Sequence, residues 1–365
     1  MDLRALVTGI ARAHRLDAVR FAPVGPTPRF DAFADWIAAG HHGDMAWIAR
    51  EPAVRADPRA RFPSARTAAV FTVHHAHARP PDPGGRTGLV ARYAWGRDYH
   101  NLLGKRIDKV RRDLRAAGIA SWGGVDTPPI LERAWAEAAG VGITGKNGLQ
   151  IRPGQGSWRF LAVLFLDAAL PPDPPLPRVA GRDPCGRCAR CLTGCPTDAF
   201  VAPRVLDARR CIAYWTIEAR TVAPEALRPR FGRWLFGCDL CQEVCPHNHH
   251  PPDPDEADLL PRHAWLDCDE LLETPDDALD ARFLGTPLRR PGAAGLKRNA
   301  AIVLGNLRDP GGAPALIHHG LTHPHPGVVE AARWALDRLA GVDQDSAAAD
   351  PVGRTAASRS TNSAT

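Results

Sequence analysis

The chain has 365 residues, long enough for two or three domains with substantial hydrophobic cores. Hydrophobic residues make up 44% and charged residues 24%, as in an ordinary soluble globular protein, and the longest apolar run, residues 160–166, is far too short to span a bilayer. The net charge of +6 and the pI near 9.0 permit a polyanionic partner such as nucleic acid, although only four of the 46 basic residues are lysine, so the arginine excess can also reflect coding bias.

The first 14 residues intersperse charges with apolar side chains at helical spacing. They contain neither a hydrophobic signal region nor a twin-arginine pair. We therefore expect a cytoplasmic protein with no membrane association, in which cysteine thiols stay reduced.

The N-terminal part of the chain predicts an α/β domain over residues 1–175. Its first 60 residues are mainly helical in pattern, and residues 99–117 predict a long helix that ends at Gly118. Strands are expected at three places, namely residues 67–73, the neighbourhood of Leu149, and residues 160–166.

A shorter helix is expected over residues 131–139. Thr127 can cap its start and Pro128 can occupy its first position. The Pro-rich stretch 171–177 predicts a stiff linker, and so a domain boundary near residue 175.

Eight of the nine cysteines lie between residues 185 and 246. The first four follow the C-x2-C-x2-C-x3-C-P run that ligates [4Fe-4S] clusters, and the second four repeat it with one ligand displaced upstream. The first copy is Cys185, Cys188, Cys191 and Cys195, and the second copy is Cys211, Cys238, Cys241 and Cys245. Three closely spaced thiolates wrap one cluster, whereas the cysteine before the proline ligates the other cluster.

This crossing predicts two ligand sets in a ferredoxin-like module over residues 176–250. One set is Cys185, Cys188, Cys191 and Cys245, and the other is Cys195, Cys211, Cys238 and Cys241. A disulfide framework or paired zinc sites are the alternatives, but the first suits small secreted chains and the second does not need the Cys-Pro position. We expect Cys268 to be a plain small side chain.

The rest of the chain predicts a helical domain over residues 251–342. Residues 251–261 form a Pro-rich spacer, and residues 296–339 have a helix–turn–helix rhythm similar to a HEAT repeat. Residues 343–365 are rich in Ala, Ser, Thr and Asp without an apolar face, and are expected to be disordered.

A glycine-rich run at residues 140–147 satisfies both G-x-G-x-x-G and G-x-x-x-x-G-K. Both nucleotide-binding fingerprints need a strand before the glycines and a helix after them, whereas here the order is reversed. Asn147 also stands where a P-loop requires a hydroxyl. We interpret the run as the end of a helix, with a bare backbone that a large cofactor can approach closely.

Several strings along the chain resemble the epoxyqueuosine reductase family. They are RYAWGRDYH (92–100), DTPPILERA (126–134), GKN (145–147), the eight-cysteine module, YWTIE (214–218) and RNAAIVLGN (298–306). They occur in that family's order and extend over nearly the whole chain except the tail.

The resemblance implies an enzyme that removes the epoxide oxygen of epoxyqueuosine at the tRNA wobble position, giving queuosine. It implies two [4Fe-4S] clusters and cobalamin as cofactors, an N-terminal cobalamin-binding α/β domain similar to reductive dehalogenases, and a HEAT-like domain that contacts tRNA. An external electron donor is required, and we expect a monomer. No D-x-H-x-x-G motif is present, so we expect no protein ligand to the cobalt.

By the same resemblance, Asp126 is the candidate proton donor and Tyr99 a second catalytic candidate. From sequence alone, an Asp before Thr-Pro is more often a cap or turn residue, and an aromatic residue in a helix is usually core. The predicted helix start after Pro128 would favour the carboxylate of Asp126, whereas burial beside a corrin would raise its pKa and keep the acid form available. The candidate cobalamin contacts are Arg55, Gly145, Lys146 and Asn147, although Arg55 and Lys146 could equally be ordinary solvated cations.

Four basic residues are candidate phosphate contacts for tRNA, namely Arg289, Arg290, Lys297 and Arg298. Each alone could instead be a solvated surface charge. Two other functions stay open at this point: a corrinoid iron–sulfur reductase of a small molecule, and a non-catalytic ferredoxin-type electron carrier. The carrier leaves the N-terminal α/β domain unexplained, because a domain of that size is a natural place for chemistry.

Overall fold

The computed structural model describes residues 2–174, 176, 184–252, 254 and 256–341. Its N-terminal part is a four-stranded antiparallel sheet with the order β1-β2-β7-β4. The strands are β1 (Ala18–Pro23), β2 (Thr67–His74), β7 (Arg159–Leu166) and β4 (Ser121–Gly124). Strands β2 and β7, which read as continuous apolar runs, are the two central strands.

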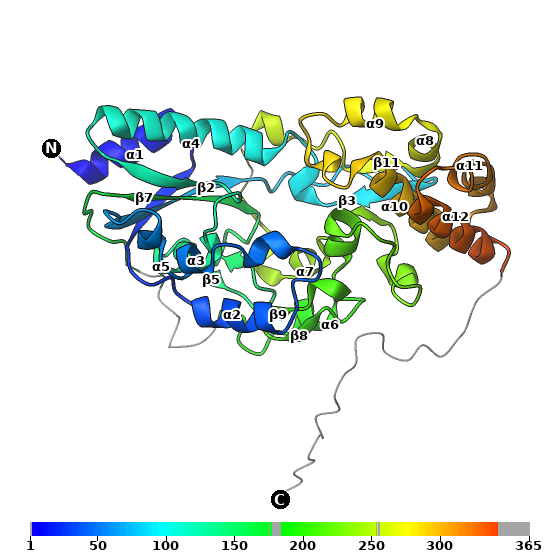
Figure 1. Cartoon of the computed structure of the whole chain (residues 1–365), viewed down its shortest axis with the longest axis horizontal. Coiled ribbons are helices and arrows are strands. Elements are labelled where there is room, and N and C mark those ends of the chain that lie inside the picture. The colour runs from blue at the N-terminus through cyan, green and yellow to red at the C-terminus, as the bar shows by residue number, and fades with distance from the viewer. Residues whose placement is uncertain (1, 175, 177–183, 253, 255, 342–365) are drawn as a thin grey trace, which may run out of the picture.

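Both faces of this sheet are buried, because alternate residues of the central strands enter two separate cores. On one face Phe71 and Leu164 pack with the helices α1 (Leu3–Ala13) and α4 (Tyr99–Ala116). On the other face Val70 and Phe165 pack with α5 (Glu132–Ala138) (Figure 1). The sheet is therefore a layer between helices, with the N-terminus of α4 at one end.

Smaller elements extend this part of the chain. The helices α2 (Phe30–Ala38) and α3 (Pro52–Ala56) precede β2, and the short strands β5 (Ile143–Thr144) and β6 (Gln150–Ile151) form a hairpin after α5.

A second sheet joins the three parts of the chain. Its order is β10-β3-β11, with β3 (Thr87–Val90) between β10 (Trp234–Phe236) and β11 (Trp265–Asp267). One strand comes from the N-terminal part, one from the cysteine-rich part and one from the C-terminal part. The hydrophobic core around this sheet is continuous with that of the C-terminal helices, so the three parts of the chain share one framework.

The cysteine-rich part carries two short helices, α6 (Arg190–Thr193) and α7 (Leu240–Glu243), and the hairpin β8 (Phe200–Ala202) and β9 (Val205–Leu206). The C-terminal part is helical around α10 (Gly292–Leu307), which is buried on nearly all sides. The helices around it are α8 (Cys268–Glu273), α9 (Asp276–Arg282), α11 (Ala313–Ala315) and α12 (Pro326–Leu339) (Figure 1). The expected helix–turn–helix pattern over residues 296–339 is confirmed.

Three local expectations were wrong. The strands β1 and β4 were not predicted, since one is broken by an arginine and a proline and the other is half glycine. Helix α5 begins at Glu132, and the residue at its cap is Leu131, so Thr127 and Pro128 belong to the preceding loop. The long helix, by contrast, ends within one residue of its predicted end.

The glycine-rich run is a helix end, as interpreted. Gly140 follows α5 with a φ of 68°, and its N–H donates to the Glu137 carbonyl 3.0 Å away. The expected tail at residues 343–365 lies outside the described residues, as does part of the linker 171–177. Among the described residues no helix combines the length and the apolar character needed to cross a membrane.

Candidate functional site

The eight cysteines of the two motif copies are free thiols. They lie in two sets, each joining three cysteines of one copy to one cysteine of the other. Burial raises the pKa of Cys185, and the neighbouring thiols of Cys191 and Cys245 raise it further. The pKa of Cys245 is raised by burial and by the thiol of Cys188. These four cysteines are therefore near neighbours, as the crossed ligand set requires.

The second set is built in the same way. Burial raises the pKa of Cys238, with the thiols of Cys211 and Cys241 adding to it. The pKa of Cys241 is raised by burial and by Cys211, Cys195 and Cys191. Because Cys191 belongs to the first set, the two sets are neighbours, as two clusters exchanging electrons must be.

The donor sets suit iron–sulfur clusters rather than single ions. Buried thiols with raised pKa values need strong positive charge to become thiolates, and iron supplies it. Main-chain N–H groups already point at sulfur: Lys146 N is 3.4 Å from Cys185 Sγ, and Ala199 N is 3.4 Å from Cys195 Sγ. Among the described residues no three His, Cys, Asp or Glu side chains converge on a single ion, whereas a cubane needs its thiols spread around a larger body.

The GKN segment lies against the cysteine loops. Lys146 Nζ donates to the carbonyls of Gly186 (2.8 Å) and Cys188 (3.0 Å), and Asn147 Nδ2 donates to that of Cys241 (3.1 Å). Gly145 packs so closely on Ile151 that a Cβ would collide with that side chain. Lys146 and Asn147 thus use these polar groups to fix the two cysteine loops, and a contact of either residue with cobalamin stays a prediction.

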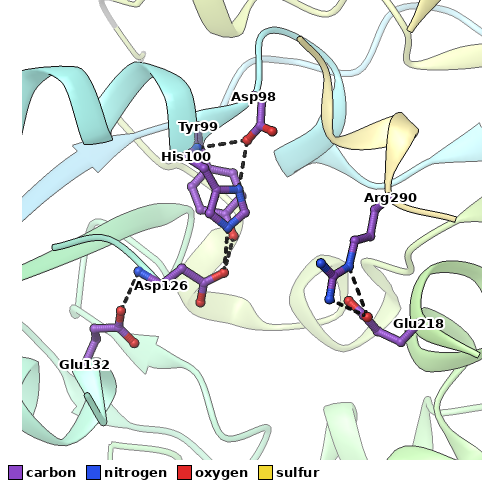
Figure 2. A network of polar contacts seen from close by, with 7 residues as sticks. All are labelled: Asp98, Tyr99, His100, Asp126, Glu132, Glu218 and Arg290. Atoms are coloured by element: carbon purple, nitrogen blue, oxygen red, sulfur yellow. Dashed lines mark hydrogen bonds and ion pairs between the residues drawn. The ribbon is translucent and has the colours of Figure 1, made fainter. Parts of the chain in front are cut away.

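Asp126 lies in the loop between β4 and α5, at the N-terminal end of α4. Its Oδ2 accepts hydrogen bonds from Tyr99 Oη (2.7 Å) and His100 Nε2 (2.9 Å) (Figure 2). The carboxylate is 56% exposed, so a substrate can reach it. The structure thus joins both catalytic candidates, Asp126 and Tyr99, in one network.

His100 is the basic member of this network. Its Nδ1 lies 2.8 Å from Asp98 Oδ1, which also caps α4 by accepting from the His100 N–H at 2.9 Å. Burial alone would lower the pKa of His100, but the hydrogen bonds to Asp126 and Asp98 outweigh it and raise the pKa to about 9. His100 is therefore an imidazolium at neutral pH.

The pKa of Asp126 is shifted in the opposite direction, below its ordinary value. Burial acts to raise its pKa, but the hydrogen bonds from His100 and Tyr99 hold it below the ordinary value. Of the two opposite effects considered for Asp126, the one that favours the carboxylate prevails, and the proton of this pair resides on His100. The pKa of Tyr99 is raised by burial and by the Asp126 carboxylate, so its hydroxyl stays protonated.

A column of stacked rings holds these donors in place. The ring centroids of His75 and Phe160 are 4.3 Å apart, those of Phe160 and Tyr99 are 4.4 Å apart, and those of Tyr99 and His100 are 4.1 Å apart. Phe160 belongs to β7, so the column connects the network to the central sheet.

Arg55 lies beside the Asp126 loop. It is half-buried, and its guanidinium is 5.6 Å from the ring centre of Phe33. Burial lowers the pKa of Arg55, while the carboxylates of Glu132 and Glu51 offset part of this effect. Arg55 is therefore a cation at the edge of the site.

Arg290 and Glu218 face the Asp126 network across the site (Figure 2). Arg290 pairs with Glu218 at 3.0 Å, and its guanidinium lies 5.1 Å from the ring centre of the exposed Trp47. Arg289 is also exposed. The contacts of Arg290 thus join all three parts of the chain, since Glu218 belongs to the cysteine-rich part and Trp47 to the N-terminal part.

The other two candidate phosphate contacts are corrected. Arg298 is 3% exposed and donates to the carbonyls of Trp215 and Ala219, at 2.9 Å each. Lys297 is 5% exposed and pairs with Asp276 at 2.8 Å. Both lie on α10, which is covered on nearly all sides, so their charges are used inside the protein and cannot reach a phosphate.

Three members of the site were missed by sequence reasoning, namely His100, Glu132 and Glu218. His100 could have been found, because an Asp cap directly before Tyr-His places both rings on the first turn of a helix. Glu132 and Glu218 gave no such local signal, because their role depends on loops distant in sequence.

Comparisons with known proteins agree with this geometry. Residues 184–248 match the family described as "4Fe-4S double cluster binding domain", and residues 55–127 match "Epoxyqueuosine reductase QueG, DUF1730". The chain is 40% identical over 319 residues to an epoxyqueuosine reductase of Pseudomonas aeruginosa, covering 83% of this chain and 85% of the relative. It is 38% identical over 311 residues to that of Gloeobacter violaceus, covering 82% and 92%.

Solved structures give the same result. One is a crystal structure of epoxyqueuosine reductase with a tRNA-Tyr epoxyqueuosine-modified stem loop, at a TM-score of 0.84 and 27% identity, covering 92% of this chain and 90% of that one. Another, from Bacillus subtilis, has its catalytic aspartate loop swung out of the active site, with a TM-score of 0.84, 25% identity and the same coverage.

Proposed function

The chain belongs to the epoxyqueuosine reductase family, and we infer that it reduces epoxyqueuosine at the wobble position of tRNA to queuosine. The observation that carries this function is the identity of 38–40% with named reductases over more than four fifths of the chain. The reaction breaks both C–O bonds of the epoxide, forms a C=C bond, and takes two electrons and two protons, so that the oxygen leaves as water.

The two cysteine sets are proposed to hold two [4Fe-4S] clusters, and the α/β domain to hold cobalamin. When bound, cobalamin would supply a reduced cobalt centre, which no protein side chain can provide, and the clusters would be its source of single electrons. Arg55 is retained as a candidate contact, since it is a half-buried cation beside the Asp126 loop. An external electron donor, a monomeric state and a cytoplasmic location stay part of this proposal.

The Asp126 network is proposed to deliver protons to the departing oxygen. The imidazolium of His100 holds a proton 2.9 Å from Asp126 Oδ2, and the exposed carboxylate can pass it on to a bound substrate. The hydroxyl of Tyr99, 2.7 Å from the same oxygen, fixes the direction of the carboxylate. Asp126 therefore relays protons rather than storing one.

The tRNA is proposed to dock on the exposed face formed by Arg289, Arg290 and Trp47. An arginine and an exposed indole offer a phosphate contact and a stacking surface, the two features that single-stranded RNA loops use. Arg290 lies opposite the Asp126 network in Figure 2, and Trp47 packs on Arg290, which supports a role in holding the anticodon loop near the chemistry.

We predict that Arg290→Ala weakens binding of an epoxyqueuosine-containing stem loop by about fivefold and reduces the salt slope of log K by about 1. The protein should remain nearly as stable as the wild type, because the Arg290 side chain is half exposed and ion pairs of this kind contribute little. Fluorescence anisotropy at several salt concentrations measures both quantities. The matched control is Arg112→Ala, an exposed arginine near the far end of α4. Equal losses in both variants would contradict a local contact.

The function itself is tested in cells that lack this protein. Their tRNA is digested to nucleosides and analysed by mass spectrometry. We expect epoxyqueuosine to accumulate and to be converted to queuosine when the wild-type chain is restored. Normal queuosine in the absence of the protein would overturn the assignment. An absorption spectrum of the purified protein tests the cofactors, because corrin bands beside the cluster absorption separate this enzyme from a plain electron carrier.

A further inference from the structure

The backbone of Asp126 is held in an unfavourable conformation. Its φ is 54°, in the left-handed region that residues other than glycine seldom adopt, at a cost of about 1–2 kcal/mol. Such a conformation persists only where neighbouring groups fix it. The hydrogen bonds from Tyr99 and His100 hold the carboxylate but not the main chain.

The main chain is fixed by Glu132, the first residue of α5. Its Oε1 accepts a hydrogen bond from the Asp126 N–H at 2.6 Å (Figure 2). This bond joins two residues that are six positions apart in the sequence, and it ties the loop between β4 and α5 to the start of α5. Within that loop, Thr127 N and Ile130 N donate only to carbonyls of the same loop, so neither attaches it to α5.

We propose that Glu132 is a positioning residue that latches the main chain of Asp126 in its catalytic conformation. The proposal rests on the proposed function only in taking Asp126 to be the catalytic residue that the latch holds in place. The latch itself is a property of the protein without substrate. A Bacillus subtilis relative, whose catalytic aspartate loop is swung out of its active site, indicates that loops of this kind have two positions.

The charges around Glu132 make the latch sensitive to pH. The groups that face it are Asp126 in the loop, Arg133 beside it on α5, Arg55 on α3 and Tyr99 on α4. Burial, with the charge of Asp126 adding to it, raises the pKa of Glu132 to about 8. An opened loop would return Glu132 to water and to its ordinary pKa.

The direction of the pH effect follows from the linkage between proton binding and loop closure. A carboxyl that has a higher pKa in the closed loop than in the open loop binds its proton more tightly when closed. Closing is therefore favoured at low pH and loses that advantage as the pH rises towards 8. His100 acts in the same direction, since its pKa is also raised in the closed state, to about 9.

Hydrogen exchange at the Asp126 amide measures the latch directly, in the purified protein without substrate. We expect Glu132→Ala to accelerate exchange at this amide by about tenfold, since the amide loses its only acceptor among the described residues. Glu132→Gln should change it by less than about threefold, because the amide oxygen still accepts the bond. The matched control is Glu137→Gln, another carboxyl on α5 that contacts Thr144 instead of the loop.

Two further readouts separate positioning from folding. In the wild type, protection of the Asp126 amide should fall between pH 6 and 9 after correction for intrinsic exchange. In Glu132→Gln the share of this pH dependence due to His100 should persist, and the share due to Glu132 should be lost. In turnover, kcat should fall more for Glu132→Ala than for Glu132→Gln, while tRNA affinity stays unchanged. Wild-type exchange at the Asp126 amide in Glu132→Ala, or a wild-type pH dependence of protection in Glu132→Gln, would overturn the latch even if the enzyme reduces epoxyqueuosine.

Discussion

Asp126→Ala is expected to lower kcat for epoxyqueuosine reduction by at least about a hundredfold, the usual scale for loss of a group that transfers protons. The variant removes the only side chain in the described site that contacts both Tyr99 and His100 and is also exposed towards the substrate. The cysteine sets do not touch this loop, so both clusters should be retained. Single-turnover conversion of a modified stem loop, followed by nucleoside mass spectrometry, gives the rate.

Asp126→Asn distinguishes proton transfer from shape. Asparagine keeps an oxygen that accepts from Tyr99 and His100, and it tolerates a positive φ, but it cannot carry a proton between His100 and the substrate. We expect a loss similar to that of the alanine variant. The control is Asp108→Ala, an exposed carboxylate further along α4. Full activity in Asp126→Asn would assign the residue to positioning alone.

The parts of the fold that could be predicted are those with a strong local pattern. Strands β2 and β7 are apolar throughout because both sheet faces are covered, and α4 has a regular apolar stripe ending at Gly118. Strand β4 carries no such pattern. Its pairing with β7 depends on glycines, and at Gly123 a Cβ would collide with the Val163 carbonyl.

The residues of the site could be predicted where chemistry fixes their spacing in the sequence. They could not be predicted where their role depends on whether the fold buries them. The cysteine copies carry their own ligand pattern, and the structure brings thiols of both copies close together, while the crossed division into two sets of four stays a prediction. Arg298 looked like a surface charge because one sequence cannot reveal that α10 is enclosed on nearly all sides. The balance at Asp126 between a favoured carboxylate and a raised pKa could not be decided from the sequence, because the two donors on α4 reach it only in the fold.

The crossed ligand sets lead to a prediction about pairs of substitutions. Removing two cysteines of one set damages one cluster, whereas removing one cysteine from each set damages both. Cys188→Ala with Cys245→Ala should therefore leave one intact cluster, with about four of about eight irons. Cys188→Ala with Cys195→Ala, two neighbours in one motif copy, should lose both clusters and nearly all the iron.

Iron and sulfide analysis together with electron paramagnetic resonance of the reduced protein decides between these outcomes. The expected difference is large because each cluster depends on thiolates that buried, uncharged replacements cannot supply. Cys268→Ala is the control: this buried cysteine starts α8, outside both motif copies, and its loss should leave all the iron in place. If the two motif copies instead held one cluster each, the iron contents of the two double variants would be exchanged. That result would also detach Cys245 from the loop that Lys146 fixes, and the electron path would have to be redrawn with each copy as a separate carrier.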